Sequence, residues 1–510
     1  MRIRLTFAAL IFPAALAAQQ PLSAIDWLKQ DIAVPVVAAR PKPTLIEPPI
    51  SQSVIVPQVA VTTLDQPTFD AVGLLPSSVT GLPASLWRPS HQADLVALIA
   101  AQEVDDYPAM QALLYTLLLA EAEPASDAGP DAPLLQARID KLRDLGAIDQ
   151  AQALLERAGV STPPLFARWF DLTLLTGDED KACDALNRQP KLSPSYSARI
   201  FCLARGGDWS TAALTLETAA ALRFITLEQE RLLAQFLDPD LFEDEPVPTP
   251  SVPDPLTVRM MEAIGEPLAT APLPRAFAMS DLRNTSGWKA ELEAGERLAK
   301  TGALSENQLL GIYTTRSPAA SGGIWDRVAA VQNLDKAITA GDATAISAAL
   351  PAAWAAMQSV QLEVPFAQFY GERLAPLSLS GPAAQQAYHM ALLSNGYEAA
   401  ARGNAAQTSK IDRFLAGLAL GTPDAALAET DQERAIAAAF TIQQPEPETA
   451  AMLAQGQLGE VILLAMTAYT SGAAGNLVDI TTSLATLRSV GLEDTARRAA
   501  IQLILLKRGV

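Results

Sequence analysis

Histidine, cysteine and aromatic residues are scarce in this sequence of 510 residues. It has 2 histidines and 2 cysteines, and only 6% of its residues are aromatic. His91 and His389 lie far apart, and neither stands at zinc-ligand spacing from a cysteine. We expect both to be surface or packed residues. The sequence therefore predicts no metal site, no cofactor and no catalytic residue.

Basic residues are outnumbered by acidic ones. The chain has 37 Lys and Arg against 56 Asp and Glu, a formal net charge of −19. Proteins that bind nucleic acids or anionic membranes present clustered positive charge, which this balance does not favour. We expect no nucleic-acid partner.

Long apolar runs are confined to the N-terminus. Met1–Arg4 carries two arginines, an apolar run follows from Leu5 to Ala18, and Ala15–Ala17 supplies small residues. This order is typical of a secretory signal peptide, and the run is too short to span a bilayer comfortably. We expect residues 1–17 to be cleaved and the mature protein to be periplasmic or secreted, with no transmembrane segment.

Cys183 and Cys202 occupy nearly mirror positions across a predicted turn. Cys183 lies seven residues before Pro190, and Cys202 lies eight residues after Pro194. Mirror positions face each other in an antiparallel helix pair, within reach of a disulfide. We expect a Cys183–Cys202 disulfide in an oxidising compartment, with two reduced core thiols as the alternative. No Cys-x-x-Cys motif indicates redox catalysis.

Residues 18–90 are rich in proline, with ten prolines from Pro35 to Pro89. Proline removes a backbone donor and disfavours helix at the preceding residue, so we expect an extended segment here. Its apolar residues indicate that parts of it lie along the surface of the following domain. Ile25, Trp27 and Leu28 are candidates for docking a partner protein.

Alanine makes up about a sixth to a fifth of the chain, which favours closely packed helices. Three turns share one pattern, a glycine followed by Ala five residues later and Leu nine residues later. The turns begin at Gly146, Gly177 and Gly207, 31 and 30 residues apart. Glycine allows a tight reversal and Ala allows close approach, so each unit is predicted to be a helix hairpin stacked on its neighbours.

On this pattern, carried most clearly by Gly146–Ala151, the sequence resembles tetratricopeptide-like α-helical repeats. It is similar to the irregular superhelical domains of exported bacterial proteins such as soluble lytic transglycosylases. The resemblance covers about 91–237 and, more weakly, 287–402, and the repeat is shorter than the usual 34 residues. It implies an all-α fold, an irregular solenoid of helix hairpins. The Glu-Ser and Gly-Leu-Met-Gln motifs of the transglycosylase catalytic domain are missing from this chain.

An acidic, proline-rich stretch at 238–256 is predicted to link two helical halves, 91–237 and 257–510. Ser286–Lys289 matches a Ser-x-x-Lys nucleophile motif. The accompanying motifs of that family lie within about twenty residues of it and in the wrong order, so we attribute the match to chance.

These observations predict a periplasmic, non-enzymatic scaffold or adaptor that binds another protein or polymer of the cell envelope. Two alternatives remain. One is a cell-wall glycan enzyme whose acid is a Glu in the second half, and the other is a scaffold in polysaccharide export.

Overall fold

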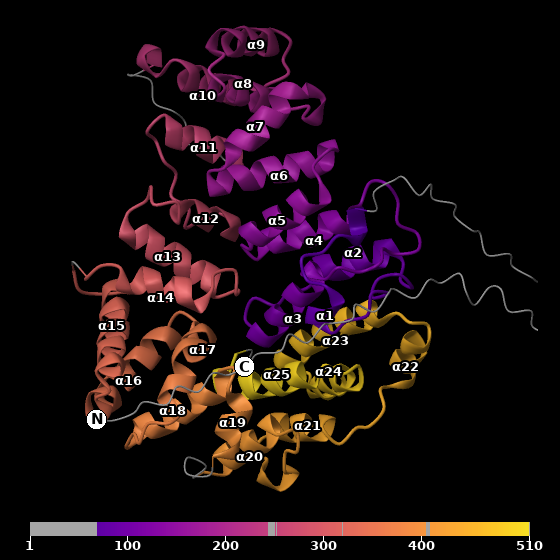
Figure 1. Cartoon of the computed structure of the whole chain (residues 1–510), viewed down its shortest axis with the longest axis vertical. Coiled ribbons are helices and arrows are strands. Elements are labelled where there is room, and N and C mark those ends of the chain that lie inside the picture. The colour runs from indigo at the N-terminus through magenta and orange to yellow at the C-terminus, as the bar shows by residue number, and fades with distance from the viewer. Residues whose placement is uncertain (1–68, 243–249, 251, 319, 404–408, 509–510) are drawn as a thin grey trace, which may run out of the picture. The chain divides into compact units, whose positions relative to one another are not determined.

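The computed structural model describes residues 69–242, 250, 252–318, 320–403 and 409–508. These residues belong to one unit, which comprises residues 64–510. They form 25 α-helices with short 3-10 turns, and the only β-pairing among them is an isolated bridge between Leu75 and Ala120 (Figure 1). The predicted all-α fold is confirmed. None of the described helices has the length and apolar character needed to cross a bilayer.

The first ten helices lie between Ser77 and Leu237. From α4 onward each packs against the next in the chain. Their bounds are α1 (Ser77–Thr80), α2 (Gln92–Ala100), α3 (Pro108–Leu119), α4 (Pro133–Asp144), α5 (Ile148–Ala158), α6 (Pro163–Thr176), α7 (Glu179–Arg188), α8 (Tyr196–Arg205), α9 (Trp209–Ala221) and α10 (Leu227–Leu237).

The later helices begin at Pro255. Among them, α11 and α12 pack back against α6. The bounds are α11 (Pro255–Ala263), α12 (Ala278–Asp281), α13 (Trp288–Ala299), α14 (Glu306–Thr314), α15 (Ile324–Ala340), α16 (Ala343–Gln358), α17 (Glu363–Leu374), α18 (Pro382–Leu393), α19 (Tyr397–Arg402), α20 (Lys410–Ala419), α21 (Asp431–Ala439), α22 (Pro447–Ala454), α23 (Leu458–Ala473), α24 (Leu477–Ser489) and α25 (Glu493–Leu506).

The three repeat glycines lie in turns between consecutive helices, joining α4 to α5, α6 to α7 and α8 to α9. Gly146, Gly177 and Gly207 have φ angles of 82°, 89° and 84°, in the region that glycine adopts without steric cost. In each turn the N–H of the next residue donates to the carbonyl five residues earlier, which closes the preceding helix. The alanines five residues after the glycines, Ala151, Ala182 and Ala212, are fully buried. The turns therefore lie between tightly packed helices, because only a small side chain fits at those positions.

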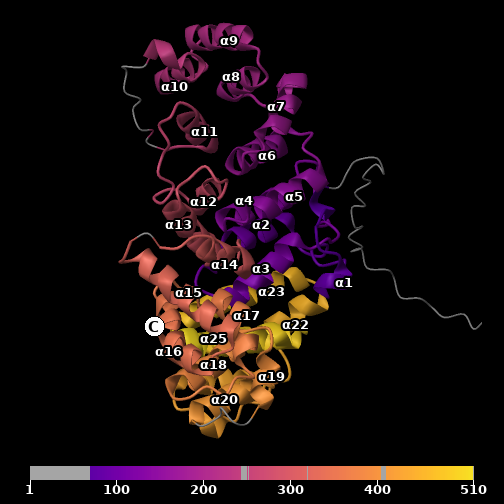
Figure 2. The same cartoon turned by 60° about the vertical axis from the view of Figure 1, so that its left-hand side comes forward.

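The end of the chain returns to its beginning. α25 packs against α3, and α23 packs against α2 (Figures 1 and 2). The side-chain oxygen Oε1 of Gln502 in α25 accepts a hydrogen bond of 2.8 Å from the backbone N–H of Ala109 in α3. Contacts in this unit thus extend beyond neighbouring hairpins, unlike a solenoid in which each repeat contacts only the next.

Residues 69–90, expected to belong to the extended N-terminal segment, are part of this unit. Leu86 and Trp87 are fully buried rather than lying along its surface. Trp87 lies over α23 at Gly459, where an added Cβ would come within 2.5 Å of the indole ring. The Oγ atom of Ser90 donates a 2.9 Å hydrogen bond to Glu460. The absence of a side chain at Gly459 makes room for Trp87, which the local sequence of 69–90 does not reveal.

A buried arginine fixes the start of this segment. Arg138 in α4 is fully buried and donates hydrogen bonds to four carbonyls, those of Asp70, Val72, Leu118 and Ala120. Burial lowers the pKa of its guanidinium to about 10, and the Asp70 carboxylate opposes that effect. The segment is therefore attached to both α3 and α4.

Neither the predicted linker at 238–256 nor the boundary at residue 90 separates units in the structure. Both helical halves belong to the unit 64–510. Pro239–Phe242 form a short 3-10 helix, and α11 begins at Pro255. Residues 243–249 and 251 lie outside the described residues, as do the predicted signal peptide at 1–17 and the docking candidates Ile25, Trp27 and Leu28.

Cys183 in α7 and Cys202 in α8 form a disulfide. Their Cα atoms are 4.7 Å apart, and both residues are buried. This is the pairing that the mirror positions favour. The bond connects the second helix of one hairpin to the first helix of the next.

Loss of this disulfide should destabilise the protein. The bond closes a loop with a sequence separation of 19, so replacing both cysteines with alanine should lower the free energy of unfolding by about 3 kcal/mol in the chain-entropy treatment. Denaturant unfolding measures the change. Reductant should lower the stability of the wild type by a similar amount and leave the double variant unaffected. A wild type insensitive to reductant would show that the thiols are not paired.

Candidate functional site

The structure places neither histidine in a reactive arrangement. His91 precedes α2 at the surface, with Nδ1 3.5 Å from a carboxylate oxygen of Asp127. His389 in α18 lies 2.8 Å from Asp412. No group of three or more His, Cys, Asp or Glu residues with metal-binding geometry occurs in the described ranges.

A serine, an aspartate and a histidine lie in contact near the start of α20, but not in the order of a catalytic triad. They are Ser409, Asp412 and His389. One Asp412 oxygen lies 2.8 Å from His389, and the other accepts a 2.6 Å hydrogen bond from the Ser409 hydroxyl. Burial opposes ionisation of Asp412, but the bonds from Ser409 and His389 outweigh it and lower its pKa. In a triad the imidazole lies between serine and aspartate, whereas here the aspartate lies between. Ser409 and Asp412 form a capping box at the start of α20, and His389 of α18 contacts its aspartate.

The Ser-x-x-Lys match at 286–289 has separate polar partners. The Ser286 hydroxyl donates to Asp281, and Lys289 Nζ lies 3.6 Å from Glu293 in the next turn of α13. The hydroxyl of Ser286 thus bonds to a carboxylate rather than to Lys289, the residue that accompanies the nucleophile in that motif.

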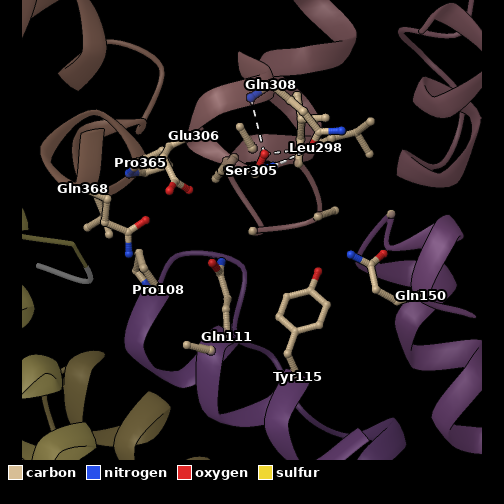
Figure 3. Close-up of a pocket in the computed structure, with 18 of the residues that line it drawn as sticks. Pro108, Gln111, Tyr115, Gln150, Leu298, Ser305, Glu306, Gln308, Pro365 and Gln368 are labelled. Carbon is tan, nitrogen blue, oxygen red and sulfur yellow. Dashed lines mark hydrogen bonds between the residues drawn. The ribbon is translucent and has the colours of Figure 1, made fainter. Parts of the chain in front are cut away.

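The carboxyl group of Asp171 in α6 has a strongly raised pKa, which lies near neutrality. Burial and the nearby carboxylate of Asp254 raise its pKa to about 7, against opposing effects of Arg143 and Arg168. Raised carboxyl pKa values are common among catalytic acids. Asp171, however, lines neither the pocket formed by α3, α5, α13, α14 and α17 (Figure 3) nor the groove formed by α17, α18 and α19. We therefore treat it as a structural carboxyl, partly buried among charged neighbours.

The clearest surface feature of the first half lies on α9 and the turn into α10. Leu214, Leu222, Phe224 and Leu227 have exposed fractions of 64%, 58%, 55% and 74%, and we call these four residues the α9 face. Trp209, at the start of α9, is also exposed. In both views α9 lies at one end of the described helices, beside α8 and α10 (Figures 1 and 2). These four residues lie within 14 positions of one another in the sequence, and groups of exposed apolar side chains commonly mark interaction surfaces.

Acidic residues predominate in the sequence that contains the α9 face. Between residues 208 and 240 the sequence has six acidic residues and two arginines, Arg223 and Arg231. The acidic residues are Asp208, Glu217, Glu228, Glu230, Asp238 and Asp240. This stretch therefore combines exposed apolar side chains with an excess of negative charge, which favours a positively charged counterpart.

The sequence did not lead us to the α9 face, although it contains an indication of it. Ala212, Leu216 and Ala219 fill the buried side of α9. Leu214 and Leu222 lie outside that buried stripe and are exposed. A surface helix normally has one apolar stripe, so apolar residues on two sides indicate either complete burial or a second contact surface.

The chain matches no known protein family, no curated protein and no solved structure.

Replacing Asp171 with asparagine should stabilise the protein in a pH-dependent manner. The folded pKa of about 7 exceeds the ordinary value of 3.8, so the folded state binds more protons than the unfolded state between these values. The free energy of unfolding of the wild type therefore falls as pH rises from 4 to 7. The free energy of unfolding of Asp171→Asn should therefore exceed that of the wild type. The difference should grow from pH 4 to pH 7, reach at most about 4 kcal/mol and stay constant above pH 7.

Denaturant unfolding at several pH values measures this difference. Asp184→Asn is the matched control, because Asp184 is an exposed residue of the neighbouring α7. The control should leave the pH profile unchanged. A stability difference for Asp171→Asn that does not vary with pH would contradict the raised pKa.

Proposed function

We propose that this protein is a non-enzymatic scaffold of the cell envelope, exported by its N-terminal segment, which binds a partner protein through the α9 face. The observation that carries the proposal is the exposure of Leu214, Leu222, Phe224 and Leu227 at more than half of each residue's surface. Four large apolar side chains in a stretch of 14 residues are costly to leave in water, and a partner that covers them regains that free energy.

The position of α9 within the hairpin series supports this proposal. We propose that α4–α9 form a short tetratricopeptide-like solenoid, in which each hairpin covers the apolar side of its neighbour. Terminal hairpins of solenoids usually have a polar outer side, because no further repeat covers them. The outer side of α9 carries the exposed Leu214 beside polar residues such as Thr211 and Glu217. A large apolar residue at such a position is expected where another protein covers the surface.

The charge around the α9 face identifies the kind of partner. Six acidic residues against two arginines between 208 and 240 repel an acidic segment and attract a basic one. We therefore propose that the partner contributes an amphipathic segment with large apolar residues on one side and Lys or Arg beside them. The charges would accelerate association and select the partner, while the apolar contacts would provide most of the affinity.

Site-specific cross-linking tests this function. A photoreactive amino acid at position 214 or 222 should yield the same cross-linked envelope protein, and the cross-linked peptide should contain both apolar and basic residues. Purified partner should then bind Leu214→Asp at least about 30-fold more weakly than wild type, because apolar anchors of interfaces contribute 2 kcal/mol or more. Binding of the wild type should weaken as salt is raised.

Val478→Asp is the matched control, because Val478 in α24 is a 70% exposed apolar residue far from α9 in the sequence. It should bind the partner like wild type, and a photoreactive residue at 478 should not capture the same protein. Three results would contradict the proposal. They are cross-links between copies of this chain alone, a partner peptide without basic residues, and equal effects of Leu214→Asp and Val478→Asp on binding.

A further inference from the structure

Trp209, the first residue of α9, has an exposed fraction of 51%, although its ring packs against the neighbouring helix. The centroid of its ring lies 6.5 Å from that of Phe236 in α10. Phe236 in turn stacks on the buried Phe201 of α8, with the centroids 5.4 Å apart. These contacts hold the indole against α10 and leave about half of the residue open to solvent. A partner therefore meets a ring whose position is already set, which lowers the entropic cost of binding to it.

The helix ends beside Trp209 favour positive charge. α8 ends at Arg205, shortly before α9 begins, and Phe236 lies in the last turn of α10. Both helices pack against α9 (Figure 1). The C-terminal end of a helix carries a partial negative charge. α8 and α10 thus bring two negative ends to Trp209, against the single positive end of α9, which the side chain of Asp208 caps.

The ionisable side chains at these helix ends are mostly acidic. Residues 201–210 and 233–242 contain one basic residue, Arg205, and three acidic ones, Asp208, Asp238 and Asp240. Arg205 lies 2.5 Å from Asp180 and 3.5 Å from Glu179, so its charge is balanced within the chain. Lys181 follows these two acidic residues in the first turn of α7, whose net charge is therefore negative as well. This end of the α8–α10 helices favours a cation.

The carboxylate of Asp208 is held in place and has an oxygen available for a ligand. Its Oδ1 atom accepts hydrogen bonds of 3.2 Å from the N–H of Thr211 and the hydroxyl of Ser210. The bonds from Thr211 lower the pKa of Asp208, so the group is ionised at neutral pH. Within the described part of the chain, the exposed Oδ2 atom has no hydrogen-bond partner. A carboxylate next to an indole suits a guanidinium, which stacks on aromatic rings and donates from several N–H groups.

We infer that Trp209 and Asp208 bind an arginine of the partner, whose guanidinium lies over the indole and donates to Oδ2 of Asp208. The inference rests on the proposed function, because it specifies how the partner's basic residue is recognised. Lysine fits less well, since its compact ammonium is strongly hydrated and does not stack.

The length of α9 sets the spacing within the partner. α9 has 13 residues and spans about 20 Å, with Trp209 at one end and with Leu222 and Phe224 just beyond the other. The partner's arginine should therefore lie about 20 Å from the apolar residues that cover Leu222 and Phe224. This separation fixes the direction in which the partner's segment runs along α9.

Synthetic peptides test the inference on the full chain. The probe is an acetylated and amidated helical peptide of alanine and glutamine, with leucines at one end and one arginine about 20 Å away. Its analogues carry lysine, or citrulline as the neutral isostere, in place of the arginine. The arginine peptide should bind about fivefold more tightly than the citrulline peptide, which is the size of effect expected of an exposed cation–π contact. The lysine peptide should lie between them.

Two variants remove the arginine site without disturbing the core. Trp209→Leu keeps apolar bulk but removes the ring, and Asp208→Asn removes the charge but keeps a residue that caps α9. Each should lower the preference for arginine over citrulline toward onefold. Trp325→Leu is the matched control, because Trp325 is a partly exposed tryptophan of α15, far from α9 in the sequence. It should keep the fivefold preference.

Leu222→Ala separates this inference from the proposed function. It should weaken the binding of all three peptides by a similar factor and leave the preference for arginine unchanged. If Leu222→Ala weakens binding but wild type does not distinguish arginine from citrulline, the inference is wrong while the proposed function stands. The inference is also wrong if Trp209→Leu and Asp208→Asn keep the full preference, or if the arginine peptide does not bind at about 1 mM.

Discussion

The N-terminal end of α3 is where the early and late parts of this chain are joined. Asp105 and Asp106, just before the helix, pair with Arg275 at 2.6 Å and with Lys300 at 3.1 Å. The first N–H groups of a helix have no partner within it, and Gln502 of α25 accepts from one of them, that of Ala109. A single helix end thus receives contacts from three later segments of the chain.

The last described residue extends this junction to α17. Arg508 donates to the backbone carbonyl of Asp106 and forms a buried ion pair with Glu363 at the start of α17. Burial raises the pKa of Glu363, and the charge of Arg508 opposes that effect. Removing either partner would leave the other charged group buried and unpaired, which is strongly destabilising. The same contacts link the start of α3 to the start of α17.

Local features of the fold could be predicted from the sequence. The contact of the chain's end with α3 and α17, which we call the closure, could not. The glycine turns and the approach of Cys183 to Cys202 depend on residues within about thirty positions of one another. The bond between Ala109 and Gln502 spans 393 residues, and no pattern in either segment specifies it. In the second half, the turns at Gly456, Gly475 and Gly491 also have positive φ, with values of 82°, 118° and 87°. They do not match the repeat pattern, because Val461 and Ile480 stand in place of the alanine five residues later and Ala500 stands in place of the leucine nine residues after Gly491.

Hydrogen–deuterium exchange tests the closure most directly. Gln502→Leu combined with Arg508→Leu removes the C-terminal hydrogen bonds and the ion pair to α3 and α17. Apolar bulk stays at both positions, and the other contacts of α25 with α3 remain. If the junction holds the unit together, exchange should accelerate at the first turns of α3 and α17 and in the turn between α13 and α14. Exchange in α8 and α9 should stay unchanged. Acceleration confined to α25 would contradict this account, because it would show that α3 and α17 hold their positions without the polar contacts from the end of the chain.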